Sequence, residues 1–226
     1  MSSKIFLIIG ATGATGIEVT ERALHNKQKV VLYVRNPAKL PAHLAADPNV
    51  TARVHTGTLD DAPSFQKAFK NVATVISLLG PSATSPGPTS QYYPVILRMM
   101  RTSGVKRIVS LSTFAVSQPE DRFALSAALT HAIGKVLFPK GIKNFINTHQ
   151  ILIEDGTDID WTEVRVGMLK NNAQPGESLS VGYIGAPKFA LDIRRKHIAE
   201  FMVAEAEKGV ADSQWIKKSP AIWTSS

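Results

Sequence analysis

The feature that most constrains the fold lies ten residues into the chain, where glycines recur every third position in IIGATGATG, residues 8–16. Residues 4–9 before it form an almost continuous β-branched and aliphatic run, typical of a strand buried on both faces of a parallel sheet. The residues after it repeat an apolar face at helical spacing, with Ile17, Thr20, Ala23 and Leu24. The glycines therefore belong to a turn between a buried strand and a helix.

Such a turn suits a phosphate group. A helix N-terminus carries unpaired N–H groups and a partial positive charge, so a turn without side chains lets a pyrophosphate approach closely. We expect Gly10 to permit the tight bend, Gly13 the close approach and Gly16 the packing of helix on strand. Thr12 and Thr15 can add hydroxyl donors. The predicted phosphate-binding residues are therefore Gly10, Thr12, Gly13, Ala14, Thr15 and Gly16. A turn with a purely structural role is the alternative.

The rest of the chain alternates between predicted strands and helices. Further strands are expected at 29–34, 50–55, 72–79, 107–112 and 160–166. A long helical stretch is expected over 123–154, interrupted near Pro139 and Gly141. This order predicts an α/β fold with a Rossmann-like, doubly wound parallel sheet. We expect one NAD(P)-binding domain over residues 1–226, in which about 168–226 form a small extension on the substrate side.

Composition narrows the function classes. The chain has 226 residues and no cysteine, which excludes disulfides, thiolate nucleophiles and cysteine-ligated metal clusters. Six histidines are scattered, so no metal is expected. The net charge of +8 favours an anionic ligand, but no nucleic-acid motif is found, and no run is long enough to span a membrane. We expect a cytoplasmic monomer or homodimer that acts on a small molecule.

In a doubly wound sheet the ligand lies across the carboxyl ends of the strands. The residues expected there, besides the glycine turn, are Arg35, Lys39, Thr58, Leu59, Leu79, Gly80, Ser112, Gly167 and Met168. NAD-binding folds usually place an acidic residue at the end of the second strand, whereas an arginine accommodates a 2′-phosphate. Here Arg35 stands at that place and Lys39 follows, so NADP(H) is the predicted cofactor. An ordinary surface role for Arg35 is the alternative.

Four ordered motifs resemble a known family. GATGATG, VRNPAKL at 34–40, KRIVSLST at 106–113 and DWTEVRVG at 160–167 are similar to NmrA-like, atypical short-chain dehydrogenase/reductases, including the flavin reductase/biliverdin-IXβ reductase branch. The resemblance runs from Lys4 to about Met168. It implies a Rossmann domain that binds NADP(H), with a small C-terminal part over the substrate. It does not fix a substrate.

The catalytic pair of typical short-chain dehydrogenases, Tyr-x-x-x-Lys, is missing. Ile146 and Gln150 stand where the pair would be, and His149 is the titratable group nearby. An H-x-x-x-K pair, His131 and Lys135, could imitate it in another register, although a surface or packing role for His131 is the alternative. We predict Ser112 and His149 as catalytic residues.

The predicted role of Ser112 is a hydrogen bond to a substrate carbonyl beside the nicotinamide; a strand-end hydroxyl bound to backbone is the alternative. Tyr92 and Tyr93 could bring a phenol over the site or serve packing, and Tyr183 is a weaker candidate. The Pro/Gly-rich loop 80–91 is either a mobile lid or a connection without a role.

Three functions compete. The first is an NADPH-dependent reductase of a small apolar carbonyl, quinone or conjugated compound, with secondary metabolism as a candidate setting. The second is a regulatory protein that senses NADP(H), which the missing Tyr/Lys pair supports. The third is a non-redox isomerase or cyclase that uses His149 or His131 as acid and base.

Overall fold

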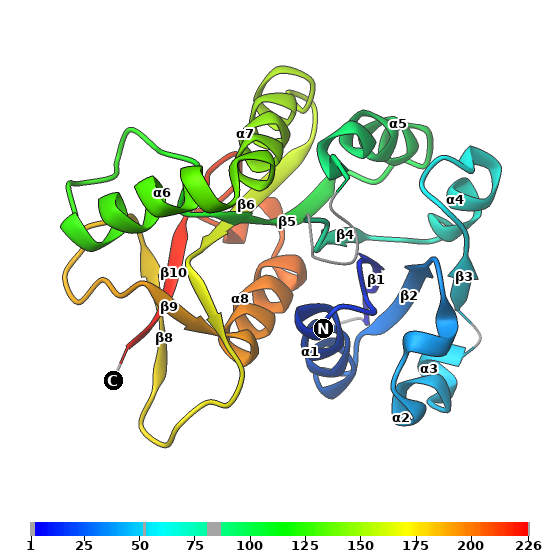
Figure 1. Cartoon of the computed structure of the whole chain (residues 1–226). Coiled ribbons are helices and arrows are strands. Elements are labelled where there is room, and N and C mark those ends of the chain that lie inside the picture. Colours follow the sequence, from blue (N-terminus) through cyan, green and yellow to red (C-terminus); the bar gives the residue numbers. More distant parts are fainter. Residues whose placement is uncertain (1–2, 52, 81–86, 226) are drawn as a thin grey trace.

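The computed structural model describes residues 3–51, 53–80 and 87–225, and within them an eight-stranded sheet forms the centre of the molecule (Figure 1). In spatial order its strands are β3 (Val54–Thr56), β2 (Lys29–Val34), β1 (Ile5–Ile9), β4 (Thr74–Ser77), β5 (Arg107–Thr113), β6 (Asp160–Val166), β10 (Ala221–Ser225) and β8 (Ser178–Gly182). Neighbouring strands pair in parallel except β10 and β8, which are antiparallel. The prediction of a Rossmann-like α/β fold is confirmed.

Helices cover both faces of the sheet (Figure 1). One face carries α1 (Ala14–His25) and α8 (Arg195–Glu207), which pack against each other. The opposite face carries α4 (Ala62–Ala68), α5 (Tyr93–Thr102) and α7 (Pro139–Glu154). The remaining elements are α2 (Ala42–Ala45), α3 (Pro48–Thr51), α6 (Leu125–Leu137), the 3₁₀ helices η1 (Pro37–Lys39), η2 (Thr89–Tyr92) and η3 (Val210–Asp212), and the strands β7 (Met168–Lys170) and β9 (Asp192–Arg194). None of the described helices is long and apolar enough to cross a membrane.

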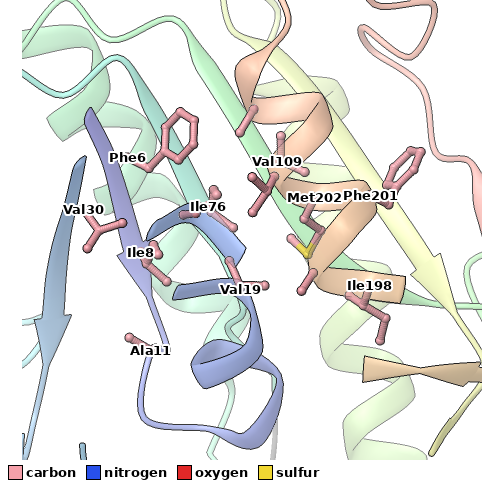
Figure 2. Close-up of a cluster of buried hydrophobic side chains, with 14 of the residues drawn as sticks. Phe6, Ile8, Ala11, Val19, Val30, Ile76, Val109, Ile198, Phe201 and Met202 are labelled. Carbon is pink, nitrogen blue, oxygen red and sulfur yellow. The ribbon is translucent and has the colours of Figure 1, made fainter. Parts of the chain in front are cut away.

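The core beneath α1 and α8 explains the apolar strand sequences. Strand side chains alternate between the two faces, so Phe6, Ile8, Ile76 and Val109 meet Val19 of α1 and Met202 of α8 (Figure 2). The other face has its own core, in which Leu7, Val75 and Ile108 pack against residues of α4, α5 and α7, among them Phe65, Leu97 and Leu152. Strands buried on both faces need near-continuous apolar runs, as this sequence has.

The structure differs from the sequence prediction at several elements, among them the fourth strand, predicted over 72–79 and found at Thr74–Ser77. The third strand spans only Val54–Thr56, because the predicted strand residue Val50 is buried within the short helix α3. The break in the long helical stretch falls at Phe138, directly before Pro139 as predicted, whereas Gly141 lies inside α7. The extension after residue 168 contributes β8 to the sheet, as the antiparallel exception to the predicted parallel order.

Residues after 168 are continuous with the sheet. They supply β8 and β10, and α8 on the face that α1 also covers. β10 joins β6 through the pair Ala221 and Arg165, while β7 and β9 form a separate small parallel pair. The segment therefore extends the same layered structure.

Candidate functional site

A cleft of about 390 Å³ opens at the carboxyl ends of the first four strands. Its lining residues come from the ends of β1 and β2, from the segments after β3 and β4, and from η2: Ile9, Gly10, Thr12, Gly13, Tyr33, Val34, Arg35, Lys39, Gly57, Thr58, Leu59, Asp60, Leu78, Leu79, Gly80, Gly87, Pro88, Thr89, Gln91 and Tyr92. The cleft thus lies where the topology predicts a ligand.

The glycine turn has three distinct local geometries. Gly10 is left-handed, with φ of 88°, and a side chain there would press on the carbonyl of Leu78. Among the described residues, a Cβ on Gly13 would meet only the Gly10 carbonyl oxygen, at 3.5 Å, and Gly13 lines the cleft. A Cβ on Gly16 would overlap the Gly10 carbonyl and lie 2.7 Å from the Ala11 Cα. These match the bend, the approach and the close helix packing expected of a pyrophosphate turn.

Residues on the helix side of the turn are less open. Ala14 is the first residue of α1, whose N-cap is Gly13. Thr15 and Gly16 belong to the buried face of that helix, and none of these three lines the cleft. Their predicted contact with phosphate would have to come through backbone N–H groups of the first turn.

Two cations border the cleft without an ion-pair partner in the described ranges. Arg35 follows the last residue of β2 and is exposed. Asn36 caps the next turn by accepting a hydrogen bond from the Ala38 N–H, at 3.0 Å, and this turn brings Lys39 to the same cleft. Among the described residues neither Arg35 nor Lys39 has a carboxylate within salt-bridge distance. An anionic ligand could therefore pair with both.

Two further side chains, Asp60 and Tyr33, line the cleft beside the predicted residues. Asp60 lines the cleft and accepts a hydrogen bond from the Tyr92 hydroxyl at 3.2 Å. Tyr33 packs on Phe65 and donates its hydroxyl to the Thr58 carbonyl at 2.9 Å. Both contacts hold the segment that contains the predicted residues Thr58 and Leu59. The sequence signal was the turn Thr58-Leu59-Asp60 itself, after a short strand.

Helix α7 fixes the far end of the cleft. The buried side chain of Asn144 accepts a hydrogen bond from the Ser90 N–H and donates one to the Thr89 hydroxyl, both at 2.8 Å. A Cβ on Gly80 would lie 3.0 Å from the Phe145 ring. The described part of the loop 80–91 is therefore anchored to α7 by side chains. Residues 81–86, which belonged to the predicted lid, lie outside the described residues.

Three further predicted residues, besides those of the first turn of α1, are absent from the described lining of the cleft. Ser112 is buried at the end of β5, and its hydroxyl has no hydrogen-bond partner among the described residues. Gly167 follows β6, and a Cβ there would overlap the Leu191 carbonyl and lie 2.7 Å from the Phe114 ring. Met168 begins β7 and is about half exposed. They lie at the carboxyl ends of the next strands of the sheet.

The predicted proton-transfer residues fall in different places. His149 lies on α7 and lines a second cavity, of about 480 Å³, which shares none of its described lining residues with the cleft. Ile146 is half-buried and Gln150 is exposed. The side chains of His131 and Lys135 lie outside the described part of the chain.

The three candidate tyrosines, Tyr92, Tyr93 and Tyr183, lie in three different environments. Tyr92 lines the cleft, whereas Tyr183 lines the second cavity. Tyr93 is fully buried and shares a 3.0 Å hydrogen bond with Ser77. Burial raises the pKa of Tyr93, so its phenol stays protonated and serves the core. Within residues 3–51, 53–80 and 87–225 no cluster of three acidic or histidine side chains could hold a metal ion.

Comparison with known proteins agrees with this geometry. A family model described as NAD(P)H-binding matches residues 10–208. No curated protein matches the chain.

Solved structures match over nearly the whole chain at low identity. A short-chain dehydrogenase/reductase from Veillonella parvula, in complex with NADP, has a TM-score of 0.79 and 16% identity, covering 98% of this chain and 95% of that one. ChuY, an anaerobillin reductase from Escherichia coli, has a TM-score of 0.72 and 17% identity, with 97% of each chain covered. The oxidoreductase ylbE from Lactococcus lactis has a TM-score of 0.69 and 15% identity, with 98% and 91% covered.

Proposed function

The chain belongs to the NAD(P)H-binding family, and from this premise we propose that it is an NADPH-dependent reductase of a small carbonyl, quinone or other conjugated compound. The observation that carries the proposal is one cleft lined by Gly13, which has no side chain, and by two cations, Arg35 and Lys39, that lack an ion-pair partner among the described residues. Similarity to a structure in complex with NADP and to an anaerobillin reductase supports it.

The cleft chemistry favours the phosphorylated form of the cofactor. Gly13 and the first turn of α1 would hold the pyrophosphate, because the helix N-terminus offers N–H donors and no side chain intervenes. Arg35 would hold the 2′-phosphate with its planar fork, and Lys39 would add a point charge. Asp60 also lines the cleft, where it accepts a hydrogen bond from the Tyr92 hydroxyl.

Hydride transfer would take place near the carboxyl end of β5, further along the same edge of the sheet. When bound, the nicotinamide supplies a hydride, and the fold supplies orientation. Ser112 lies at the end of β5, outside the lining of the cleft, and its buried hydroxyl lacks a partner among the described residues. It would donate to a substrate oxygen if that oxygen reaches this strand end. A conjugated substrate gives a stabilised anion, which can take its proton from water and needs no strong acid from the protein.

A sensing function is the second candidate, and α7 supplies the observation that favours it. The buried side chains of that helix are Asn144, Thr148 and Leu152, beside Gly141, and none of these is an acid or base. A protein that binds NADP(H) without turnover needs none. The non-redox isomerase is less favoured, because His149 does not line the cleft.

Cofactor consumption distinguishes these functions. Purified protein is mixed with NADPH and a panel of quinones, flavins and conjugated carbonyls, and the loss of nicotinamide absorbance is followed. Turnover with at least one acceptor, slowed in Ser112→Ala, is the expected result. Tight NADPH binding without turnover on any acceptor would support sensing and contradict the reductase.

A further inference from the structure

The second cavity, of about 480 Å³, has the size and walls of a small-molecule site. It lies between α7, the segment 117–120 that follows β5, and the first residues of β6 together with the segment before β10. Its aromatic and apolar wall is formed by Pro119, Ile153, Trp161 and Tyr183. Trp161 is almost fully buried and stands edge-on to the His149 ring, with their centroids 6.3 Å apart. A flat, largely apolar body would fit these walls.

A buried carboxylate sets the orientation of His149. The Nδ1 atom of His149 lies 2.5 Å from Oε2 of Glu163, whose side chain is fully buried in β6. Ser219 donates a hydrogen bond to the same oxygen at 3.1 Å. A carboxylate accepts, so Nδ1 carries the proton and Nε2 is left as the acceptor of the ring.

The other side of the ring agrees with this tautomer. His149 Nε2 lies 3.1 Å from the Gln118 amide nitrogen, which is a donor. The same amide nitrogen donates to the Ser117 carbonyl at 2.9 Å, which identifies it as the nitrogen end of the amide. Gln118 and His149 both line the cavity. His149 thus presents an oriented acceptor at the cavity wall, covered by one exchangeable side-chain donor.

Backbone hydrogen bonds hold the segment 217–219 against β6, on the side of the cavity that contains Trp161. The Lys217 N–H donates to the Trp161 carbonyl, and the Glu163 N–H donates to the Lys218 carbonyl at 3.1 Å. Lys217 is left-handed, with φ of 54°, an uncommon state for a lysine that the surrounding bonds maintain. At the rim, the exposed Lys217 and Lys218 outnumber Glu120, so the entrance is net positive.

We propose that this cavity is a second ligand site that binds a small hydroxyaryl compound, whose hydroxyl donates to Nε2 of His149 while its ring lies against Trp161. The acceptor requires a donor on the ligand, the walls require a planar apolar body, and the rim tolerates neutral or anionic substituents but disfavours cationic ones. The site does not depend on the proposed reductase function, because it shares none of its described lining residues with the cofactor cleft.

Calorimetric titration with a matched pair of neutral probes tests the proposal. Methyl para-hydroxybenzoate can donate to Nε2, and methyl para-methoxybenzoate has the same body but cannot. The hydroxy ester should bind about tenfold more tightly, which is the loss expected for a removed hydrogen bond in a buried site. Saturating NADPH should leave its affinity unchanged within about twofold, because such independent sites do not couple.

Two variants assign the contact. His149→Phe keeps a flat ring and should abolish the preference for the hydroxy ester, whereas Gln118→Ala should keep it. Should His149→Phe not fold, the ¹⁵N resonances of the His149 ring in the wild-type protein replace it, and the Nε2 signal should move on addition of the hydroxy ester alone. Equal affinity for the two esters, competition by NADPH, no binding, or a preference lost in Gln118→Ala but kept in His149→Phe would each overturn the proposal.

Discussion

The guanidinium of Arg165 and the carboxylate of Asp121 form a two-pronged ion pair, with N–O distances of 2.7 and 2.8 Å, in which the arginine side chain is fully buried. Asp121 also accepts the N–H groups of Gln118 and Ile184. The pair therefore ties the segment after β5 to β6 and to the segment after β8.

Removing Asp121 should be strongly destabilising. Asp121→Ala leaves a buried charge without its partner, and the free energy of unfolding should fall by about 3–5 kcal/mol. Asp158→Ala is the comparison, because Asp158 pairs with Arg101 at the exposed surface, where the ion pair is screened by solvent, and its loss should cost much less. Urea unfolding of both variants measures this. Equal losses would show that burial of the Arg165 pair contributes nothing.

Glu177 should make stability depend on acid pH. Hydrogen bonds from Arg194 and from the Gln174 N–H lower the pKa of Glu177 from 4.5 to about 2. A depressed carboxyl pKa contributes stability that is complete above the unfolded value and disappears as pH falls through the folded value. The difference in unfolding free energy between wild type and Glu177→Gln should therefore be constant above pH 4.5 and shrink between 4.5 and about 2. Urea titrations at stepped pH check it, and a difference that grows on acidification would have the wrong sign.

Alanine at two glycines of the turn should affect different properties, namely stability at Gly16 and NADPH affinity at Gly13. Gly16→Ala puts a methyl group into the Gly10 carbonyl and the Ala11 backbone, so stability should fall by about 1–3 kcal/mol, as overpacking does. Gly13 has extended backbone and its new Cβ would enter only the cleft, so Gly13→Ala should change stability by less than about 0.5 kcal/mol. NADPH affinity should nevertheless fall at least about tenfold in Gly13→Ala. Normal affinity in a folded Gly13→Ala would remove the turn from the binding site.

Ser112 and Ser77 form another matched pair. The Ser77 hydroxyl bonds Tyr93, so Ser77→Ala should cost about 1 kcal/mol. The Ser112 hydroxyl has no such partner in the described structure, so Ser112→Ala should be neutral within about 0.5 kcal/mol. Steady-state rates should show kcat reduced in Ser112→Ala with NADPH affinity unchanged. A large loss of stability with unaltered kcat would assign Ser112 a structural role only.

The sequence predicted best those elements that are defined locally. The buried runs of β2 and β6 end where their apolar pattern ends, and the glycine turn joins β1 to α1 as expected. The strand order then brings Arg35, Thr58 and Leu79 to one cleft with Gly13, because parallel strands share a carboxyl edge. These predictions needed only periodicity and glycine chemistry.

The remaining features depend on contacts between distant segments. β8 pairs with β10 across about forty residues of chain, and its alternation of Ser and apolar residues is too short, within a polar region rich in Gly and Pro, to set it apart. Glu163 and His149 lie on separate elements, and only packing of α7 on β6 joins them. Asn144 likewise acquires its role when α7 meets η2. No local pattern could indicate these pairings.

The most direct test of the account is a calorimetric titration of wild type and Arg35→Ala with NADPH and with NADH. Arg35 borders the cleft without a carboxylate partner in the described structure, so its loss should remove a contact that only the 2′-phosphate makes. We expect wild type to prefer NADPH, and Arg35→Ala to lose about tenfold or more in NADPH affinity while NADH affinity changes less than about twofold. Equal losses for both nucleotides, or no heat for either with folded wild-type protein, would contradict the account.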